Sequence, residues 1–228
     1  RAALSDWRVR EAMLLAFNFE FINDTLTGGR QPRITSYFSG SELGMQGGPA
    51  EGRVRELLLA HEDELLPGAL EGYALPQSDG TKRNRRNIRA AMALLDKAGW
   101  TVQDGVLKNA DGTPLDPNAL QRQDGHLRQA TTYLETYARA HERLGISLTI
   151  ETIDPAQYAE REQDFDFDIT FFRRAFSLSP GNEQTFYWGS QYADVPGSRN
   201  IMGMKDPVAE AMIAAMLASE SREDYVAA

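Results

Sequence analysis

The segment Ile146–Phe172, ISLTIETIDPAQYAEREQDFDFDITFF, contains two short alternating apolar runs with a helix start between them. In the first run Ile146, Leu148 and Ile150 alternate with polar residues, which predicts a half-buried strand that ends near Ile153. Asp154-Pro155 follows, and this pair is typical of an N-cap with proline at the first helical position. The segment therefore predicts a strand followed directly by a helix.

The second run, FDFDITFF at 165–172, predicts another strand. Its apolar residues would point one way, while aspartates 164, 166 and 168 would point the other way. Upstream, apolar residues recur at helical spacing from about His126 to Leu144, and Gly145 ends that stretch. Helix, strand, helix and strand in this order indicate parallel pairing and an α/β fold.

The amino-terminal half is predicted to be mostly helical. Ser5 or Asp6 can cap a helix that runs to about Phe17, and Gly28 and Gly29 would close a second helix at Glu20–Leu26. Residues 53–66 form an amphipathic pattern, and a further helix begins near Ile88 and ends before Gly99. Residues 30–52 show no periodicity and predict a long loop, whereas WTVQDGVLKNADGTPL at 100–115 contains two Asp-Gly turns and predicts a small β-meander.

The composition excludes several classes of protein. The 228 residues include no cysteine, so disulfides and zinc–thiolate sites are impossible, and the net charge of −9 argues against a general nucleic-acid binder. No apolar run reaches the ~20 residues needed to span a bilayer. The chain begins without Met and ends in SREDYVAA, the start of a helix, so we expect a portion of a longer protein.

The aromatic-rich stretch SLSPGNEQTFYWGSQYADVPGSRN at 177–200 is the main candidate for a binding site. We interpret it as an irregular loop that leaves a buried strand, and such loops commonly carry binding groups. It combines aromatic rings with Asn, Glu, Gln and Arg but has no nucleophile–base pair, which favours binding over catalysis. Tyr37 and Phe38 are the only large aromatics of the loop at 30–52 and are weaker candidates.

The sequence also contains weaker candidates for catalytic, metal and anion sites. Asp164, Asp166 and Asp168 could supply paired carboxylates to a hydrolase or ligands to a hard cation, although a solvated strand face explains them better. The histidines lie on separate predicted helices, so we expect no metal site. The basic run at 82–89 is interpreted as a solvated loop, and no phosphate-loop motif occurs. We expect no cofactor.

Six phrases in the chain together resemble the extracellular solute-binding proteins of peptide ABC transporters, family 5. The most specific are SLSPGNEQTFYWGS at 177–190 and PGSRNIMGMKDPVAEAMI at 196–213. The others are DWRVREAMLLAFNFEFIN at 6–23, AMALLDKAGW at 91–100, ERLGISLTIETIDPAQYAER at 142–161 and FDFDIT at 165–170. Within the family the chain is similar to the oligopeptide branch that includes microcin C and peptide-fragment importers.

The resemblance implies a two-lobed clamp of the periplasmic-binding-protein type II fold, which closes over its ligand at a hinge. Residues 1–195 would form the second lobe, a mixed sheet flanked by helices, and residues 196–228 would begin the return to the first lobe, which is absent from this chain. The protein would be periplasmic or lipid-anchored, exported by a signal peptide that this chain does not contain. It would be monomeric and would deliver a peptide or modified peptide to the permease of an ABC importer, without catalysis.

The resemblance also implies ligand-binding residues, because family members place the loop after the FDFD-like strand in the cleft. We carry that role to Arg173, Arg174, Phe176, Ser177, Asn182, Glu183, Tyr187 and Trp188, and we add Tyr37 from the earlier loop. Where classical oligopeptide binders have an aspartate for the peptide amino terminus, this chain has Ser177 or Ser179. Residues 116–125, DPNALQRQDG, replace an apolar strand of the family, so we expect a lost or replaced strand. That loss would favour a structural or partner-binding lobe without a ligand.

Overall fold

The computed structural model describes residues 2–123 and 128–228, which divide into two compact units. Unit 1 comprises the residues up to Arg33 together with Pro76–Arg161 and Asp166–Phe172. Unit 2 comprises Ile34–Leu75, Glu162–Phe165 and Arg173–Ala228. Each unit is therefore assembled from segments that are distant in the sequence.

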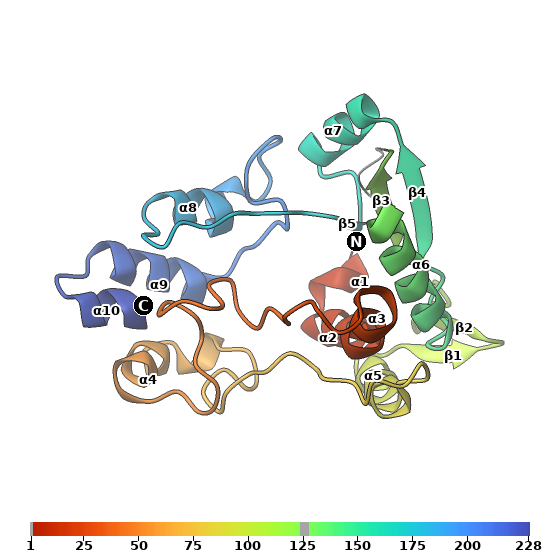
Figure 1. Cartoon of the computed structure of the whole chain (residues 1–228), viewed down its shortest axis with the longest axis horizontal. Helices are drawn as coiled ribbons and strands as arrows, with labels where there is room; N and C mark the ends of the chain where they lie inside the picture. Colours follow the sequence, from red (N-terminus) through yellow and green to blue (C-terminus); the bar gives the residue numbers. More distant parts are fainter. Residues whose placement is uncertain (1, 124–127) are drawn as a thin grey trace. The chain divides into compact units, whose positions relative to one another are not determined.

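Unit 1 contains the sheets and most of the longer helices (Figure 1). Its helices are α1 (Ala2–Ser5), α2 (Trp7–Ala16), α3 (Phe19–Thr27), α5 (Arg85–Lys97), α6 (Arg128–Glu142) and α7 (Pro155–Gln163), the last of which ends in unit 2. Its strands are β1 (Thr101–Gln103), β2 (Val106–Lys108), β3 (Asn118–Arg122), β4 (Thr149–Ile153) and β5 (Ile169–Thr170). The α/β class predicted from the sequence is confirmed.

The core of unit 1 is formed where α2 packs on α5. Val9, Ala12 and Met13 of α2 meet Ala91 and Leu95 of α5, and all five are buried. The spacing of these residues places each set on one face of its helix. Asp6 caps α2 by accepting a hydrogen bond from the backbone N–H of Arg8, as expected from the sequence.

The main sheet has the order β4-β3-β5, and both pairings are parallel. Asn118 pairs with Thr149 and Ala119 pairs with Ile169, so β3 is the central strand. Leu120 of β3 is fully buried and packs with Ile153 and Tyr158. The prediction that the strand at 116–125 is lost or replaced is therefore wrong, because a short apolar centre was enough for a central strand.

The β4–α7 connection follows the prediction closely. Asp154 accepts hydrogen bonds from the backbone N–H groups of Ala156 and Gln157, which completes the N-cap before Pro155. The strand itself starts at Thr149 rather than Ile146, although Ile146 and Leu148 are buried as expected. The predicted helix at 126–144 appears as α6, and residues 126 and 127 lie outside the described residues.

The predicted strand at 165–172 is mostly wrong, because only Ile169 and Thr170 form a strand. Phe165 has a positive φ of 53°, and the N–H of Asp166 donates to the carbonyl of Arg161. The end of α7 thus continues into a turn, so the alternation of Phe and Asp does not correspond to an extended backbone. Phe171 and Phe172 are exposed after the strand ends.

The antiparallel pair β1–β2 confirms the first Asp-Gly turn, since Asp104 and Gly105 both have positive φ as a type I′ hairpin requires. The third limb of the expected meander is a single bridge between Lys108 and Pro114. The hairpin is joined to the end of α6 by a hydrogen bond from Leu107 N to Gly145 O. A Cβ on Gly145 would lie 2.8 Å from Leu107 N, so this close approach requires glycine.

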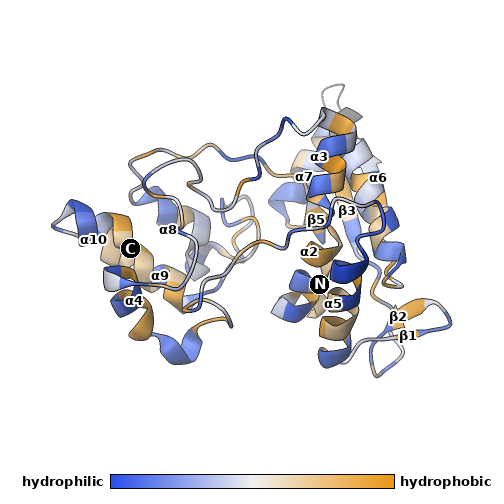
Figure 2. Ribbon diagram, turned by 60° about the horizontal axis from the view of Figure 1, so that its bottom comes forward, coloured by the Kyte–Doolittle hydropathy of each residue, from blue (hydrophilic) through white to orange (hydrophobic). Residues whose placement is uncertain are grey.

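Unit 2 contains short helices joined by long loops. They are α4 (Gly52–Leu59), α8 (Glu183–Trp188), α9 (Pro207–Leu217) and α10 (Arg222–Ala227), with 3₁₀ turns at Glu62–Glu64 and Ser190–Tyr192. The helix predicted at 53–66 is shorter than expected, and the stretch at 177–200, predicted to be irregular, contains α8 and a 3₁₀ turn. Figure 2 shows α9 as hydrophobic along most of its length.

Candidate functional site

Five aromatic side chains of unit 2 form one cluster: Tyr37, Phe38, Phe176, Tyr187 and Trp188, called the aromatic cluster below. The ring centroids of Tyr37 and Trp188 lie 4.9 Å apart, and those of Phe38 and Phe176 lie 5.2 Å apart. The rings come from the loop before α4, from the segment after β5 and from α8. Three distant parts of the sequence thus contribute to one surface.

Arg174 lies in the middle of the aromatic cluster. Its guanidinium carbon is 3.8 Å from the centroid of Tyr187 and 5.0 Å from that of Trp188, which are cation–π distances. Its Nη2 also donates to the carbonyl of Arg199 at 2.8 Å. Partial burial lowers the pKa of Arg174, but a guanidinium still carries its charge at neutral pH. The cluster therefore holds a fixed positive charge among aromatic rings.

Helix α8 is oriented by hydrogen bonds at both ends. Gly181 N–H donates to the Glu183 carboxylate at 2.9 Å, which is the main reason that the pKa of Glu183 lies below its usual value. Trp188 Nε1 donates to Gln184 Oε1 at 2.9 Å, and Gln184 is buried. The Tyr225 hydroxyl donates to the carbonyl of Pro180 at 2.6 Å, so α10 restrains the loop that leads into α8.

Asn200 fixes the chain after α8. It is fully buried, and its Nδ2 donates to the carbonyls of Gly189 and Met204 at 3.0 and 2.8 Å. Its Oδ1 accepts from Met204 N at 2.8 Å. One side chain thus replaces a set of backbone hydrogen bonds in a segment that has no regular structure.

The residues predicted from the sequence occupy different surroundings. Tyr37, Arg174, Phe176, Tyr187 and Trp188 lie together in the aromatic cluster, and the Tyr37 side chain remains 60% exposed. Arg173, Ser177 and Asn182 are exposed, and the Ser177 hydroxyl accepts a hydrogen bond from Ser179 N at 3.0 Å. Glu183 is half-buried in the first turn of α8. Their roles in ligand binding stay predictions.

Two residues of this surface, Phe38 and Arg199, were not among the predicted ligand-binding residues, although Phe38 was a weaker candidate. Phe38 belongs to the aromatic cluster, and Arg199 lies with its guanidinium carbon 5.7 Å from the Tyr187 centroid. The only sequence signal for Phe38 was its position beside Tyr37 in a loop with few aromatics. Nothing local could have placed it next to Phe176.

Two of the three aspartates considered for catalysis have separate partners in the fold. Asp166 is paired with Arg161 at 2.9 Å, and Asp168 accepts from the backbone N–H of Asn118 at 2.9 Å at the start of β3. Asp164 is exposed near the end of α7. Within residues 2–123 and 128–228, no group of three or more His, Asp or Glu side chains could hold a metal ion.

The model of the family described as "Bacterial extracellular solute-binding proteins, family 5 Middle" matches residues 1–195. The chain belongs to family 5. One relative is the "Probable peptide-binding protein YejA" of Agrobacterium fabrum, 37% identical over 97% of this chain and 36% of its own length. The chain spans little more than a third of the length of the curated relatives it matches.

Solved structures show the same fold at low sequence identity. The oligopeptide-binding protein AppA of Bacillus subtilis, solved with a nonapeptide, has a TM-score of 0.69 and 16% identity over 99% of this chain and 38% of its own. NikZ of Campylobacter jejuni, solved with Ni(L-His), has a TM-score of 0.71 and 12% identity over the same shares. In the described part of this family 5 chain, no helix is long and apolar enough to cross a membrane.

Proposed function

We propose that this chain is part of the substrate-binding component of a peptide ABC importer. The observation that carries the proposal is the aromatic cluster around Arg174, which combines apolar walls with a fixed positive charge. Membership of family 5 supports a solute-binding role, and the names of YejA and AppA support a peptide as the solute.

The chemistry of the site fits the groups that a peptide presents. Tyr37 and Trp188 offer aromatic surface to side chains, and aromatic walls accept different shapes. Arg174 or Arg199 would meet a terminal carboxylate, and Glu183 would meet a terminal ammonium. Extended peptides also need hydrogen bonds to their main chain, which loop backbone groups supply. The proposed ligand is therefore a peptide or a modified peptide.

In this proposal residues 1–195 form the second lobe and residues 196–228 begin the return to the first lobe. The first lobe would come from sequence outside this chain, as the greater length of the relatives allows. The two lobes would close on the peptide at a hinge. The intact protein would be a periplasmic or lipid-anchored monomer, exported by a signal peptide, that delivers its cargo to the permease subunits.

The other functions considered have less support. No observation favours a hydrolase, because Asp166 and Asp168 each have a structural partner. The hypothesis of a structural or partner-binding lobe without a ligand depended on the loss of a strand at 116–125. Strand β3 occupies that position, so this argument no longer holds.

The decisive experiment identifies the cargo of the intact protein. Native mass spectrometry of the protein purified from its host is expected to show bound peptides, and calorimetric titration then measures their affinity. Trp188→Ala should weaken binding by about tenfold or more, because a buried aromatic contact contributes on the order of 1.4 kcal/mol or more. Phe186→Ala is the matched control, since Phe186 lies on the same helix but its ring packs against Tyr192 at a tilted angle. Absence of any peptide, or equal effects of the two substitutions, would contradict the proposal.

A further inference from the structure

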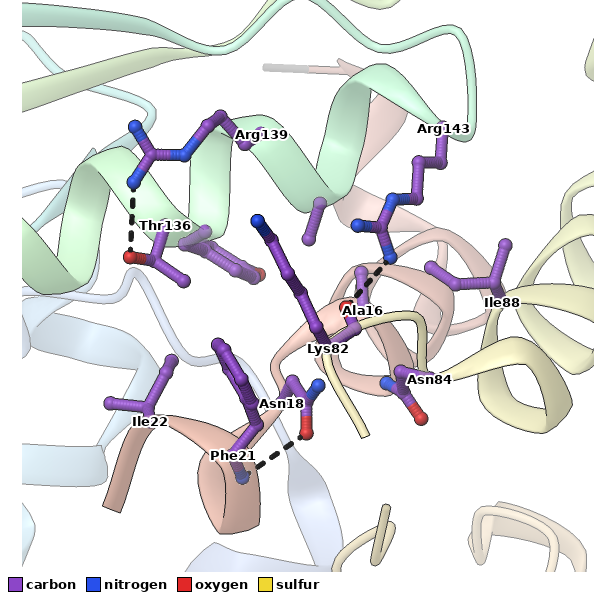
Figure 3. Close-up of a pocket in the computed structure, with 12 residues that line it drawn as sticks. Ala16, Asn18, Phe21, Ile22, Lys82, Asn84, Ile88, Thr136, Arg139 and Arg143 are labelled. Carbon is purple, nitrogen blue, oxygen red and sulfur yellow. Dashed lines mark hydrogen bonds between the residues drawn. The ribbon is translucent and has the colours of Figure 1, made fainter. Parts of the chain in front are cut away.

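Unit 1 contains a cavity of about 270 Å³ that is separate from the aromatic cluster, because all of its lining residues belong to unit 1. It lies between the α2–α3 connection, the residues just before α5, and α6 (Figure 3). The lining consists of Ala16, Asn18, Phe21, Ile22, Lys82, Asn84, Ile88, Thr136, Tyr137, Arg139, Ala140 and Arg143. No carboxylate is among these side chains.

Three cations from two segments line the cavity: Lys82, Arg139 and Arg143. In Figure 3 the Lys82 side chain crosses the middle of the view, with Arg139 on one side and Arg143 on the other. Within the described residues, none of the three forms an ion pair. Lys82, Arg139 and Arg143 are exposed residues, so water screens their charges, but three cations at one cavity with no carboxylate in its lining still favour an anion there.

The hydrogen bonds of the cations leave donors available. Arg143 Nη1 donates to the carbonyls of Lys82 and Arg83 at 3.1 and 2.9 Å, which positions its guanidinium over the loop before α5. Arg139 has one long contact, 3.4 Å from Nη2 to the Thr136 hydroxyl. A carboxylate accepts several such donors at once and is matched by the planar donors of a guanidinium.

The rest of the lining is apolar. Phe21, Ile22 and Ile88 face the cavity together with the Tyr137 ring, whose hydroxyl already donates to the Met13 carbonyl at 3.0 Å. A hydrated inorganic anion would gain nothing from these walls, whereas a hydrocarbon group would leave water on entering them. An apolar cavity of about 150 Å³ can hold benzene, so this volume corresponds to a ligand of roughly eleven non-hydrogen atoms.

We propose that this cavity binds a small amphipathic carboxylate, with the carboxylate between Lys82, Arg139 and Arg143 and the hydrocarbon part against Phe21, Ile22 and Ile88. The site goes beyond the proposed peptide function, since it uses none of the residues of the aromatic cluster. It gives unit 1 a ligand of its own.

The test uses 3-phenylpropionate, which has the required size and charge, titrated into the intact protein by calorimetry. Saturable binding is expected, and 3-phenylpropanol should bind at least about tenfold more weakly because it lacks the charge. Inorganic phosphate should not compete at equal concentration. Failure of 3-phenylpropionate to saturate, or equal binding of the alcohol, would overturn the proposal.

Matched variants distinguish binding in the cavity from non-specific attraction of the anion to positive charge on the protein. Lys82→Gln and Arg139→Gln should each weaken 3-phenylpropionate binding by about tenfold. Arg85→Gln is the control, because it removes one charge from the same basic run but does not line this cavity. Ala140→Leu should block binding by filling the space while keeping every cation. Circular dichroism checks the folding of each variant, and equal effects of Lys82→Gln and Arg85→Gln would refute the site.

An excess of the peptide cargo distinguishes this site from the peptide site. The affinity for 3-phenylpropionate is expected to stay unchanged when the peptide is present and when Trp188 is replaced by alanine. Displacement of 3-phenylpropionate by the peptide would overturn the separate site, even if peptide binding itself is confirmed.

Discussion

The guanidinium carbon of Arg174 lies 3.8 Å from the ring centroid of Tyr187, and its Nη2 donates to the Arg199 carbonyl. A methionine keeps the length of the side chain but loses the charge, the cation–π contact and the hydrogen bond. Arg174→Met should therefore lower the free energy of unfolding by about 1–2 kcal/mol, measured by urea denaturation.

Arg173→Met is the control for that substitution, because Arg173 is the exposed neighbour of Arg174 in the same segment. Its effect should stay within about 0.5 kcal/mol. Equal effects of the two substitutions would mean that the ring contacts of Arg174 contribute nothing to stability.

Asn200→Ala should be strongly destabilising. It would remove three hydrogen bonds and leave the N–H and the carbonyl of Met204 without their side-chain partner, while the Gly189 carbonyl keeps the N–H of Tyr192. We expect the free energy of unfolding to fall by about 2–4 kcal/mol, which thermal or chemical denaturation measures. Asn182→Ala is the comparison, because the Asn182 side chain is exposed and makes no capping hydrogen bond, and it should cost little.

Gly145→Ala tests the junction between α6 and the β1–β2 hairpin. The residue has a φ of +74°, and the new methyl group would meet Leu107 N at 2.8 Å. The substitution should cost roughly 2–4 kcal/mol, from backbone strain and from the clash together. Gly99→Ala, after α5, also has a positive φ but nothing within 4 Å, so it should cost only about 1 kcal/mol. Similar melting temperatures for the two variants would contradict the close approach.

Stability is expected to fall as the pH falls below about 6.5, because of His141. This side chain is fully buried, and burial lowers its pKa, while its Nδ1–H donates to the Tyr137 carbonyl at 2.9 Å. A base with a lowered folded-state pKa binds its proton more readily when unfolded, so the free energy of unfolding rises with pH through this window. One such group contributes at most about 1.4 kcal/mol per pH unit.

Urea denaturation at pH 7.5 and pH 5.5 measures this dependence. His141→Gln cannot titrate, so its difference between the two pH values should be smaller than that of the wild type, whatever its absolute stability. If His141→Gln shows the same pH dependence of stability as the wild type, groups other than His141 cause that dependence.

The sequence predicted those helix ends and turns whose conformation is determined by residues next to them in the chain. Asp154 caps α7, Gly28 ends α3, and Asp104-Gly105 forms the hairpin turn, each through hydrogen bonds or backbone angles set by neighbouring residues. The α/β class followed from the order of the predicted helices and strands, whereas the family was predicted from the resemblance of six phrases to family 5. The stretch at 177–200 was predicted to be the main candidate for a binding site; its Tyr187 and Trp188 lie in the aromatic cluster, and its role in binding stays a prediction.

Other elements depend on contacts that no window of sequence contains. Residues 118–122 look too polar for a central strand, yet β4 and β5 supply the hydrogen bonds on both sides. The Phe–Asp alternation at 165–168 looks like a strand, but the turn after α7 prevents it. Tyr37 and Phe38 reach Phe176 only through the tertiary fold of unit 2.

The strand order β4-β3-β5 also determines at which point of protein synthesis the sheet can form. As the ribosome releases the chain, β3 emerges first and remains without either neighbour until residues 149–153 and then 169–170 have followed. Until then the apolar Leu120 side chain is exposed and can make non-native contacts. Parallel pairing between strands that are far apart in the sequence forms slowly. A nascent chain arrested before residue 149 should therefore hold β3 without a partner strand and should need a chaperone, whereas the α2–α5 layer, complete by residue 97, can already have formed.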